Sequence, residues 1–119
     1  MARLLIVSAL LALVVAAAGA APASAAYHSC NISGQQTSFG PSYVTSLAVS
    51  HTSCRTGKRV VRAFHRCRKA SGGKTGRCHH RVLHYRCTEK RGYGHGQFTG
   101  KVTCTRGSRR VRHTYTQFT

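Results

Sequence analysis

The chain has almost no acidic residues. Its 119 residues include 19 Lys and Arg but only one Asp or Glu, Glu89, and no Trp. A pair of catalytic carboxylates is therefore excluded, which rules out aspartic proteases and glycosidases that use two carboxyl groups. Calcium sites that need several carboxylate oxygens are excluded for the same reason. The sequence names no reaction, but this lack of acids restricts the roles that are open to the protein.

The first 25 residues are typical of a secretory signal peptide. A basic start at Arg3 leads into an apolar run over residues 4–18, and residues 23–25 are the small residues of a cleavage site. The run is too short for a stable membrane span. We expect a secreted, extracellular protein of 94 residues, because 25 of the 119 are removed. Its formal charge is +17, since cleavage takes only Arg3 from the +18 of the whole chain.

The pattern of the remaining residues predicts an α+β fold, with one helix packed on a small antiparallel sheet in the order β-α-β-β-β. Residues 26–42 are rich in Gly, Ser and Thr and predict an irregular arm, and residues 43–119 form a single small domain. Thr52 or Ser53 caps the helix, which ends at residues 71–73. Strands are expected over residues 43–51, 82–88, 97–105 and 109–118.

Six cysteines in a small exported chain predict three disulfides, because the environment outside the cell is oxidising. The core is thin, so these bridges should decide whether the domain folds. If the first strand runs up and the helix runs down, the start of the helix and the end of the next strand meet at the top. The expected pairs are Cys54–Cys87, Cys67–Cys78 and Cys30–Cys104, with Cys67–Cys104 as the alternative.

Three short motifs resemble a group of small exported cysteine-containing bacterial proteins that are common in actinobacteria. They are the helix start at residues 53–58, the aromatic-x-Cys segment at residues 85–87, and the Val-x-Cys-x-Arg-Gly hairpin at residues 102–107. The resemblance extends over residues 43–118 and implies the same architecture. It implies no functional residue, because the group has no established activity. The pair Cys67/Cys78 and the high charge depart from its pattern.

Basic residues gather on one face of the predicted helix. They recur three or four positions apart, on a stripe about 80 degrees wide opposite the apolar face. A second cluster lies on the last predicted strand. The first group, the helix stripe, is Arg55, Arg59, Arg62, Arg66 and Lys69. The second is Arg109, Arg110 and Arg112.

These clusters predict association with polyanions. Arg outnumbers Lys by 14 to 5, and guanidinium groups form bidentate hydrogen bonds with phosphate and sulfate. Most soluble surfaces mix both signs of charge, whereas this one is nearly all positive. We expect a non-enzymatic domain that binds nucleic acid, anionic glycopolymer or acidic lipid surfaces. The absence of a sequence-reading motif predicts non-specific, salt-sensitive binding.

Two other functions remain open. A ribonuclease that needs no carboxylate would use one imidazole as base and another as acid. His84 and His113, both placed on predicted strands, could supply them, with Lys101 or Arg86 nearby. A protein inhibitor or structural module would instead bind an acidic protein partner.

The histidines also raise the question of a metal site. Imidazole is a common ligand of zinc and copper. Neighbouring arginines repel a cation, however, and adjacent histidines on a strand point to opposite faces. We therefore expect no metal site at His79, His80 and His84, and no other cofactor.

Overall fold

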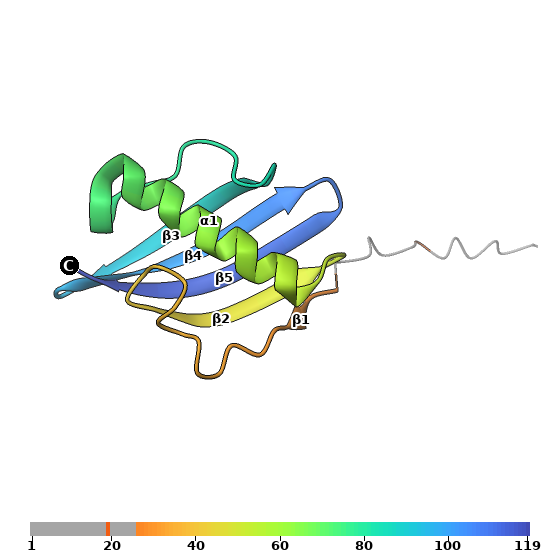
Figure 1. Cartoon of the computed structure of the whole chain (residues 1–119), viewed down its shortest axis with the longest axis horizontal. Coiled ribbons are helices and arrows are strands. Elements are labelled where there is room, and N and C mark those ends of the chain that lie inside the picture. Colours follow the sequence, from red (N-terminus) through yellow and green to blue (C-terminus); the bar gives the residue numbers. More distant parts are fainter. Residues whose placement is uncertain (1–18, 20–25) are drawn as a thin grey trace, which may run out of the picture.

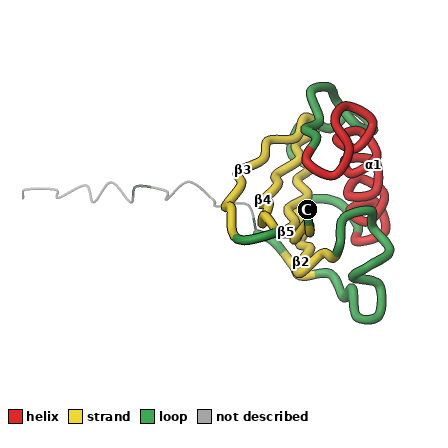
Figure 2. The backbone as a smooth tube through the Cα atoms, turned by 90° about the vertical axis from the view of Figure 1, so that its left-hand side faces the viewer, coloured by secondary structure: helices red, strands yellow, loops and turns green. Residues whose placement is uncertain are grey.

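One helix packs on one face of a five-stranded antiparallel sheet (Figure 1). The computed structural model describes residue 19 and residues 26–119. The predicted signal peptide, residues 1–25, lies outside them apart from residue 19. Figure 2 shows two layers, with the sheet on one side and the helix and loops on the other. The predicted α+β fold is confirmed. Within the described part of the chain, no helix is long and apolar enough to cross a membrane.

The sheet has the strand order β1-β2-β5-β4-β3, so the last strand of the chain lies at its centre. The predicted irregular arm includes the short strand β1, which pairs with β2. The strands are β1 (His28–Ser29), β2 (Tyr43–Ser50), β3 (Arg86–Gly94), β4 (Gln97–Arg106) and β5 (Arg109–Phe118). The helix is α1 (Cys54–Gly72), followed by the 3-10 turn η1 (Gly73–Thr75).

Local chemistry sets both ends of α1 and its distance from the sheet. The Ser53 hydroxyl accepts a hydrogen bond from the backbone N–H of Thr56 at 3.1 Å, as expected of a helix N-cap. Gly73 ends the helix with a φ of 68°, a conformation that favours glycine. At Gly57 a Cβ atom would lie 2.6 Å from a methyl group of Val49. Glycine at this position lets α1 approach β2 closely.

The strand expected over residues 82–88 begins later than its alternating pattern indicates. Val82 and Tyr85 exchange two backbone hydrogen bonds, at 3.0 and 2.7 Å, around a tight turn. Leu83 and His84 take left-handed φ values of 47° and 66° inside it. Strand β3 therefore starts at Arg86, immediately after the turn.

Two of the predicted disulfides, Cys54–Cys87 and Cys30–Cys104, are wrong. The structure pairs Cys30 with Cys54 and Cys87 with Cys104. The late start of β3 is the reason, because it puts Cys87 at the beginning of the strand, directly opposite Cys104 on β4. Strand β3 also lies at the opposite edge of the sheet from β1. Cys54 therefore pairs with the arm that leads into β2.

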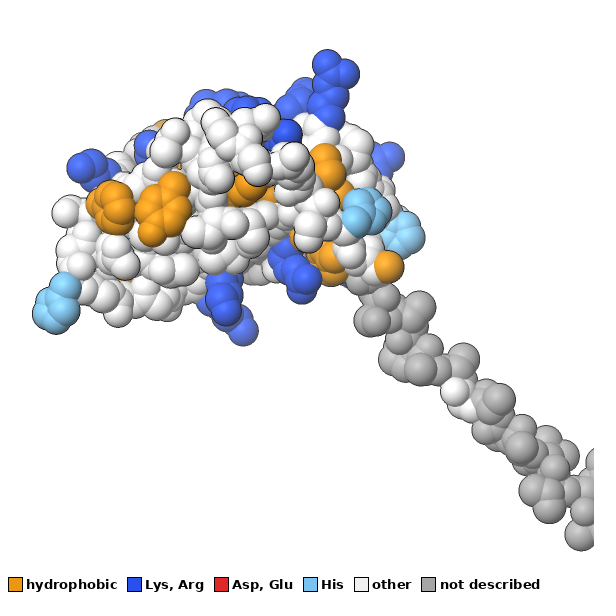
Figure 3. Space-filling view, turned by 90° about the horizontal axis from the view of Figure 1, so that it is seen from below, with side chains coloured by type: hydrophobic (Ala, Val, Ile, Leu, Met, Phe, Trp, Pro, Cys, Tyr) orange, Lys and Arg blue, Asp and Glu red, His pale blue; other side chains and the backbone are white. Residues whose placement is uncertain are grey.

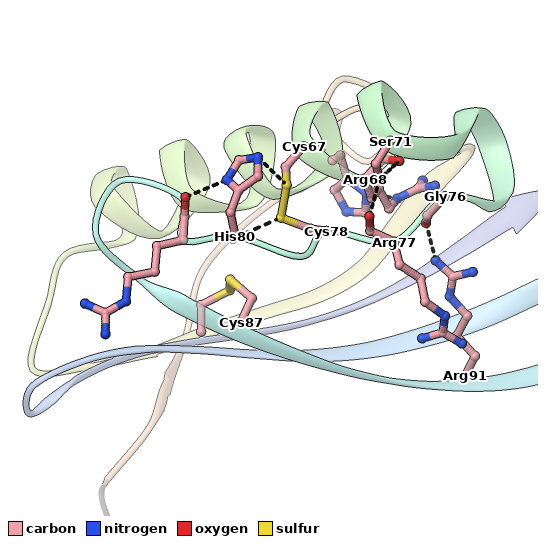
Figure 4. Close-up of a disulfide and its surroundings, with 12 residues drawn as sticks. Cys67, Arg68, Ser71, Gly76, Arg77, Cys78, His80, Cys87 and Arg91 are labelled. Atoms are coloured by element: carbon pink, nitrogen blue, oxygen red, sulfur yellow. Dashed lines mark hydrogen bonds between the residues drawn. A yellow bond between two sulfur atoms is a disulfide. The ribbon is translucent and has the colours of Figure 1, made fainter.

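The third predicted pair, Cys67–Cys78, is confirmed and ties the loop after α1 back to the helix (Figure 4). The same loop is held from the sheet, since the guanidinium of Arg91 donates hydrogen bonds to two of its backbone carbonyls, at 2.8 and 2.5 Å. Arg68 of α1 donates to a third, the carbonyl of Lys74, at 2.6 Å. Three disulfides in a small domain are typical of a protein that folds in an oxidising compartment.

Candidate anion-binding site

The helix stripe lies on the side of α1 that faces away from the sheet. Arg55, Arg59 and Arg66 are exposed there. The other two members contact the arm. The guanidinium of Arg62 lies over a phenyl ring, 4.7 Å from the centroid of Phe39, and the ammonium of Lys69 donates a hydrogen bond to a backbone carbonyl of the arm. The stripe therefore both exposes charge and holds the arm against the helix.

The basic cluster of β5 does not form one surface with the helix stripe. Successive side chains of a strand point to opposite faces. Val111 is buried toward α1, so Arg110 and Arg112 lie on the face of the sheet away from the helix. Arg109 is on the helix side, beside the β4–β5 turn. The second predicted group is thus divided between two faces.

A pocket of about 530 Å³ opens where α1 begins, and we call it the end pocket. Arg59 of the helix stripe, Arg109 of the second group and Arg106 of β4 all line it. They come from α1 and from both sides of the β4–β5 turn, elements that meet at the same end of the molecule (Figure 1). The structure therefore joins one member of each predicted basic group and adds an arginine that neither group contained.

The backbone around the end pocket is strained. Apart from glycines, the residues of the described chain with left-handed φ values are His51, Leu83 and His84, at 54°, 47° and 66°. All three line the end pocket. This conformation is unfavourable for residues with a side chain, and such residues tend to cluster at functional sites. The clustering is a second indication of a site, independent of charge.

A buried hydroxyl at the same place lacks a hydrogen-bond partner. Tyr85 lines the end pocket, and its side chain is 1% exposed. Within residues 26–119, its hydroxyl has no partner. The same holds for the hydroxyl of Ser50, next to His51 in the chain. An unpaired buried hydroxyl typically lowers the stability of the fold by about 1–3 kcal/mol. Such groups are rare, and each one needs a specific explanation.

No acidic side chain offsets the charge of the end pocket. The only acid of the chain, Glu89, accepts hydrogen bonds from Arg91 and Tyr115 between α1 and the sheet. The N-terminal end of α1 adds partial positive charge on the side of the pocket. Figure 3 shows Lys and Arg side chains on both the upper and lower sides of the molecule and no acidic one. This setting suits a phosphate or sulfate group.

The histidine pair expected for a ribonuclease is not brought together. His84 is exposed in the turn before β3, whereas His113 is 2% exposed beneath α1. Its Nε2 atom lies 3.0 Å from that of His65, and burial lowers the pKa of His113 to about 3. Lys101 and Arg86 lie on the opposite face of the sheet. His113 therefore has no access to an RNA substrate.

A buried polar network between helix and sheet went unpredicted. Arg68, a charged residue near the end of α1, is 0% exposed. Its guanidinium donates to His65 Nδ1 at 2.7 Å and to the side-chain carbonyl of Gln117 at 2.8 Å. Burial lowers the pKa of His65, and the positive charge of Arg68 beside it lowers that pKa further. His65 and Arg68 follow Val61 at helical spacing, which places them on the apolar face of α1. This spacing could have predicted their burial, but polar side chains are ordinarily expected at the surface.

The sequence predicts no metal site at His79, His80 and His84, because the neighbouring arginines repel a cation. Within the described residues, the cluster of potential metal ligands is instead Cys67, Cys78 and His80, whose ligand atoms lie within 4.8 Å of one another. Both sulfurs are joined in the disulfide, with His80 Nε2 at 3.3 Å from the sulfur of Cys67 (Figure 4). A disulfide offers no thiolate to a metal. In this oxidised state the cluster is a crosslink.

Comparison with known proteins identifies no relative, since no family model, curated protein or solved structure matches the chain. The resemblance to exported bacterial proteins stays a prediction. Function must be inferred from the geometry and charge of the end pocket and the helix stripe.

Proposed function

We propose that this protein is a secreted, strongly basic domain that binds anionic polymers, or the envelope surfaces that display them, without catalysing a reaction. The proposal rests on one observation: Arg59, Arg106 and Arg109 line the same pocket in a chain whose only acid lies elsewhere. Three arginines that line one pocket without a carboxylate repel one another, and an anionic group bound in the pocket relieves that repulsion.

The helix stripe extends the site along the molecule. Arg55 and Arg66 are exposed and lie 11 residues apart on α1, which corresponds to about 16 Å along the helix axis. A polymer that places one anionic group in the end pocket therefore meets further cations beside it. Binding of this kind draws its free energy from the release of counterions, so it weakens steeply as salt rises.

A salt-gradient binding screen tests the proposal. The purified, oxidised protein is titrated with single-stranded DNA, RNA, poly(glycerol phosphate), heparin and acidic lipid vesicles. We expect binding that falls linearly on a log–log plot against salt, with a slope of about 0.7 for each phosphate contacted on a single strand. The comparison of ligands separates phosphate from sulfate and polymers from lipid surfaces. The RNA sample stays intact if the domain is not an enzyme.

A charge-matched pair of variants separates the end pocket from net charge alone. Arg106→Gln with Arg109→Gln removes two cations from the pocket. Lys74→Gln with Arg77→Gln, which we call the loop control, removes two exposed cations outside it. The pocket variant should lose more affinity and more salt slope than the loop control. Equal losses in both would show that only the total charge matters, and binding unaffected by salt would contradict the proposal outright.

A further inference from the structure

Figure 2 shows that α1 covers only one face of the sheet. The other face presents a second group of basic side chains. Side chains two residues apart on a strand share a face. Five basic residues alternate with buried ones so that all point away from the helix, and we call this surface the outer face. Its cations are Arg86, Lys90, Lys101, Arg110 and Arg112.

The pairing of β3, β4 and β5 places these cations close to one another on the outer face. Lys90 on β3 lies directly opposite Lys101 on β4. The guanidinium of Arg110 donates to the hydroxyl of Thr105 at 3.4 Å, on the same face. Arg112 follows Arg110 by two residues, about 6.8 Å along β5. Like charges held this close repel one another in the free protein. An extended anionic polymer bound across β3, β4 and β5 would relieve this repulsion.

A groove of about 570 Å³ crosses the outer face. Lys90, Lys101 and Arg112 line it, together with hydroxyl-bearing residues such as Thr88 and Thr103. Thr103 lies directly opposite Arg112, and the hydroxyl of Thr88 is 3.5 Å from the backbone carbonyl of Thr103. Hydroxyl groups donate hydrogen bonds to phosphate oxygens, as lysine and arginine do. No carboxylate faces the groove, because Glu89 points to the helix side of the sheet. The groove therefore combines positive charge with neutral donors along its length.

Aromatic rings border the outer face and favour nucleic acid as its ligand. The ring of Tyr27 lies over the guanidinium of Arg112, with 3.9 Å to the centroid. At one end of β5, Phe118 is 50% exposed and contacts Tyr43 edge to face at 5.7 Å. Aromatic rings beside a basic groove are the platforms on which unpaired bases stack. Anionic glycopolymers have no bases, so these rings would add nothing to their binding.

We propose that the outer face is a second binding site and that its ligand is single-stranded nucleic acid. One domain then bridges two nucleic-acid molecules, one on the helix stripe and one on the outer face. The helix stripe and the outer face point in opposite directions from a body held by three disulfides. A short strand that occupies one surface leaves the other open. This inference rests on the proposed function for the nucleic acid bound at the helix stripe, and it adds a second, separate nucleic-acid molecule at the outer face.

A co-capture experiment tests the bridge. A biotinylated DNA oligonucleotide of about eight nucleotides, within the usual site size of a single-strand-binding domain, is fixed on beads. The protein is added, followed by the same oligonucleotide with a fluorescent label. We expect the beads to retain the labelled strand only when the protein is present. Lys101→Gln with Arg112→Gln should abolish this retention while the protein itself still binds the beads, whereas the loop control retains the labelled strand.

The outcomes separate this inference from the proposed function. Protein bound to the beads without the labelled strand overturns the bridge and leaves the proposed function standing. Equal co-capture by the Lys101/Arg112 variant also overturns it, because the second strand then binds elsewhere. A protein that binds heparin or poly(glycerol phosphate) but no DNA overturns it as well. A protein that binds none of these polymers overturns both proposals. Both substituted residues are exposed, so circular dichroism should show an unchanged fold.

Discussion

The Nε2 atoms of His65 and His113 lie 3.0 Å apart in the interface between helix and sheet. Arg68 Nε can only donate, so His65 Nδ1 accepts its hydrogen bond and neutral His65 has its proton on Nε2. That proton is donated to His113 Nε2. Neutral His113 then has its own proton on Nδ1, which has no partner among the described residues. Both imidazoles must be neutral for this arrangement, because two facing protonated nitrogens would repel each other.

The stability of the domain should therefore fall in acid. Burial lowers the pKa of His113 to about 3 and also lowers that of His65, whereas an unfolded histidine titrates near 6.5. Below that pH the unfolded chain takes up protons that the folded chain does not. As far as these two histidines determine it, the free energy of unfolding should be constant above about pH 6.5 and should decrease as the pH drops below that value. Each histidine contributes a slope of up to about 1.4 kcal/mol per pH unit.

Denaturant unfolding at several pH values between 7 and 4.5 measures this slope. His95→Asn provides the control, because His95 is an exposed histidine in the β3–β4 hairpin. The control should keep the slope of the unmodified protein. A free energy of unfolding that stays level down to pH 4.5 would mean that the buried imidazoles are protonated in the fold.

Disulfide mapping tests the topology. Digestion of the unreduced protein followed by mass spectrometry should yield peptides joined by Cys30–Cys54, Cys67–Cys78 and Cys87–Cys104. Recovery of a peptide joined by Cys54–Cys87 would require β3 to lie beside the start of α1. That result would contradict the pairing of Cys87 with Cys104 across β3 and β4, the register on which the outer face depends.

Two glycines of neighbouring strands should respond differently to alanine. A Cβ atom at Gly100 would lie 2.3 Å from the ring of Tyr115, whereas at Gly92 it would meet nothing within 4 Å. Overpacking against a buried ring costs about 1–3 kcal/mol. Gly100→Ala should therefore lower the free energy of unfolding by that amount, and Gly92→Ala should leave it unchanged or raise it slightly. A tolerated Gly100→Ala would show that Tyr115 is not fixed over β4.

The sequence predicts the regular elements well because their signals are local. The alternation over residues 97–105 and 109–118 recurs in β4 and β5, and Ser53 caps α1 as expected. The same alternation misplaces the start of β3, because residues 82–85 imitate a strand while their backbone turns. The disulfide error follows directly from that one misplaced boundary.

The end pocket could not be predicted in the same way. The sequence predicts both Arg59 and Arg109 as anion-binding residues, but each within its own local cluster. Their meeting with Arg106 depends on where α1 starts over the sheet, which no local pattern reveals. The burial of Arg68 is similar, since its partner Gln117 lies 49 residues away in the chain. Arrangements built from distant segments require the tertiary structure.

The most direct test of the end pocket is a titration of the isotopically labelled protein with inorganic phosphate and sulfate, followed by NMR at low salt. The account predicts saturable shifts of backbone amides and arginine Nε signals that are largest at His51, Arg59, His84, Arg106 and Arg109. The Arg106/Arg109 glutamine variant should lose these shifts, and the loop control should keep them. Small shifts spread evenly over every exposed cation, with no saturation, would contradict a built anion site.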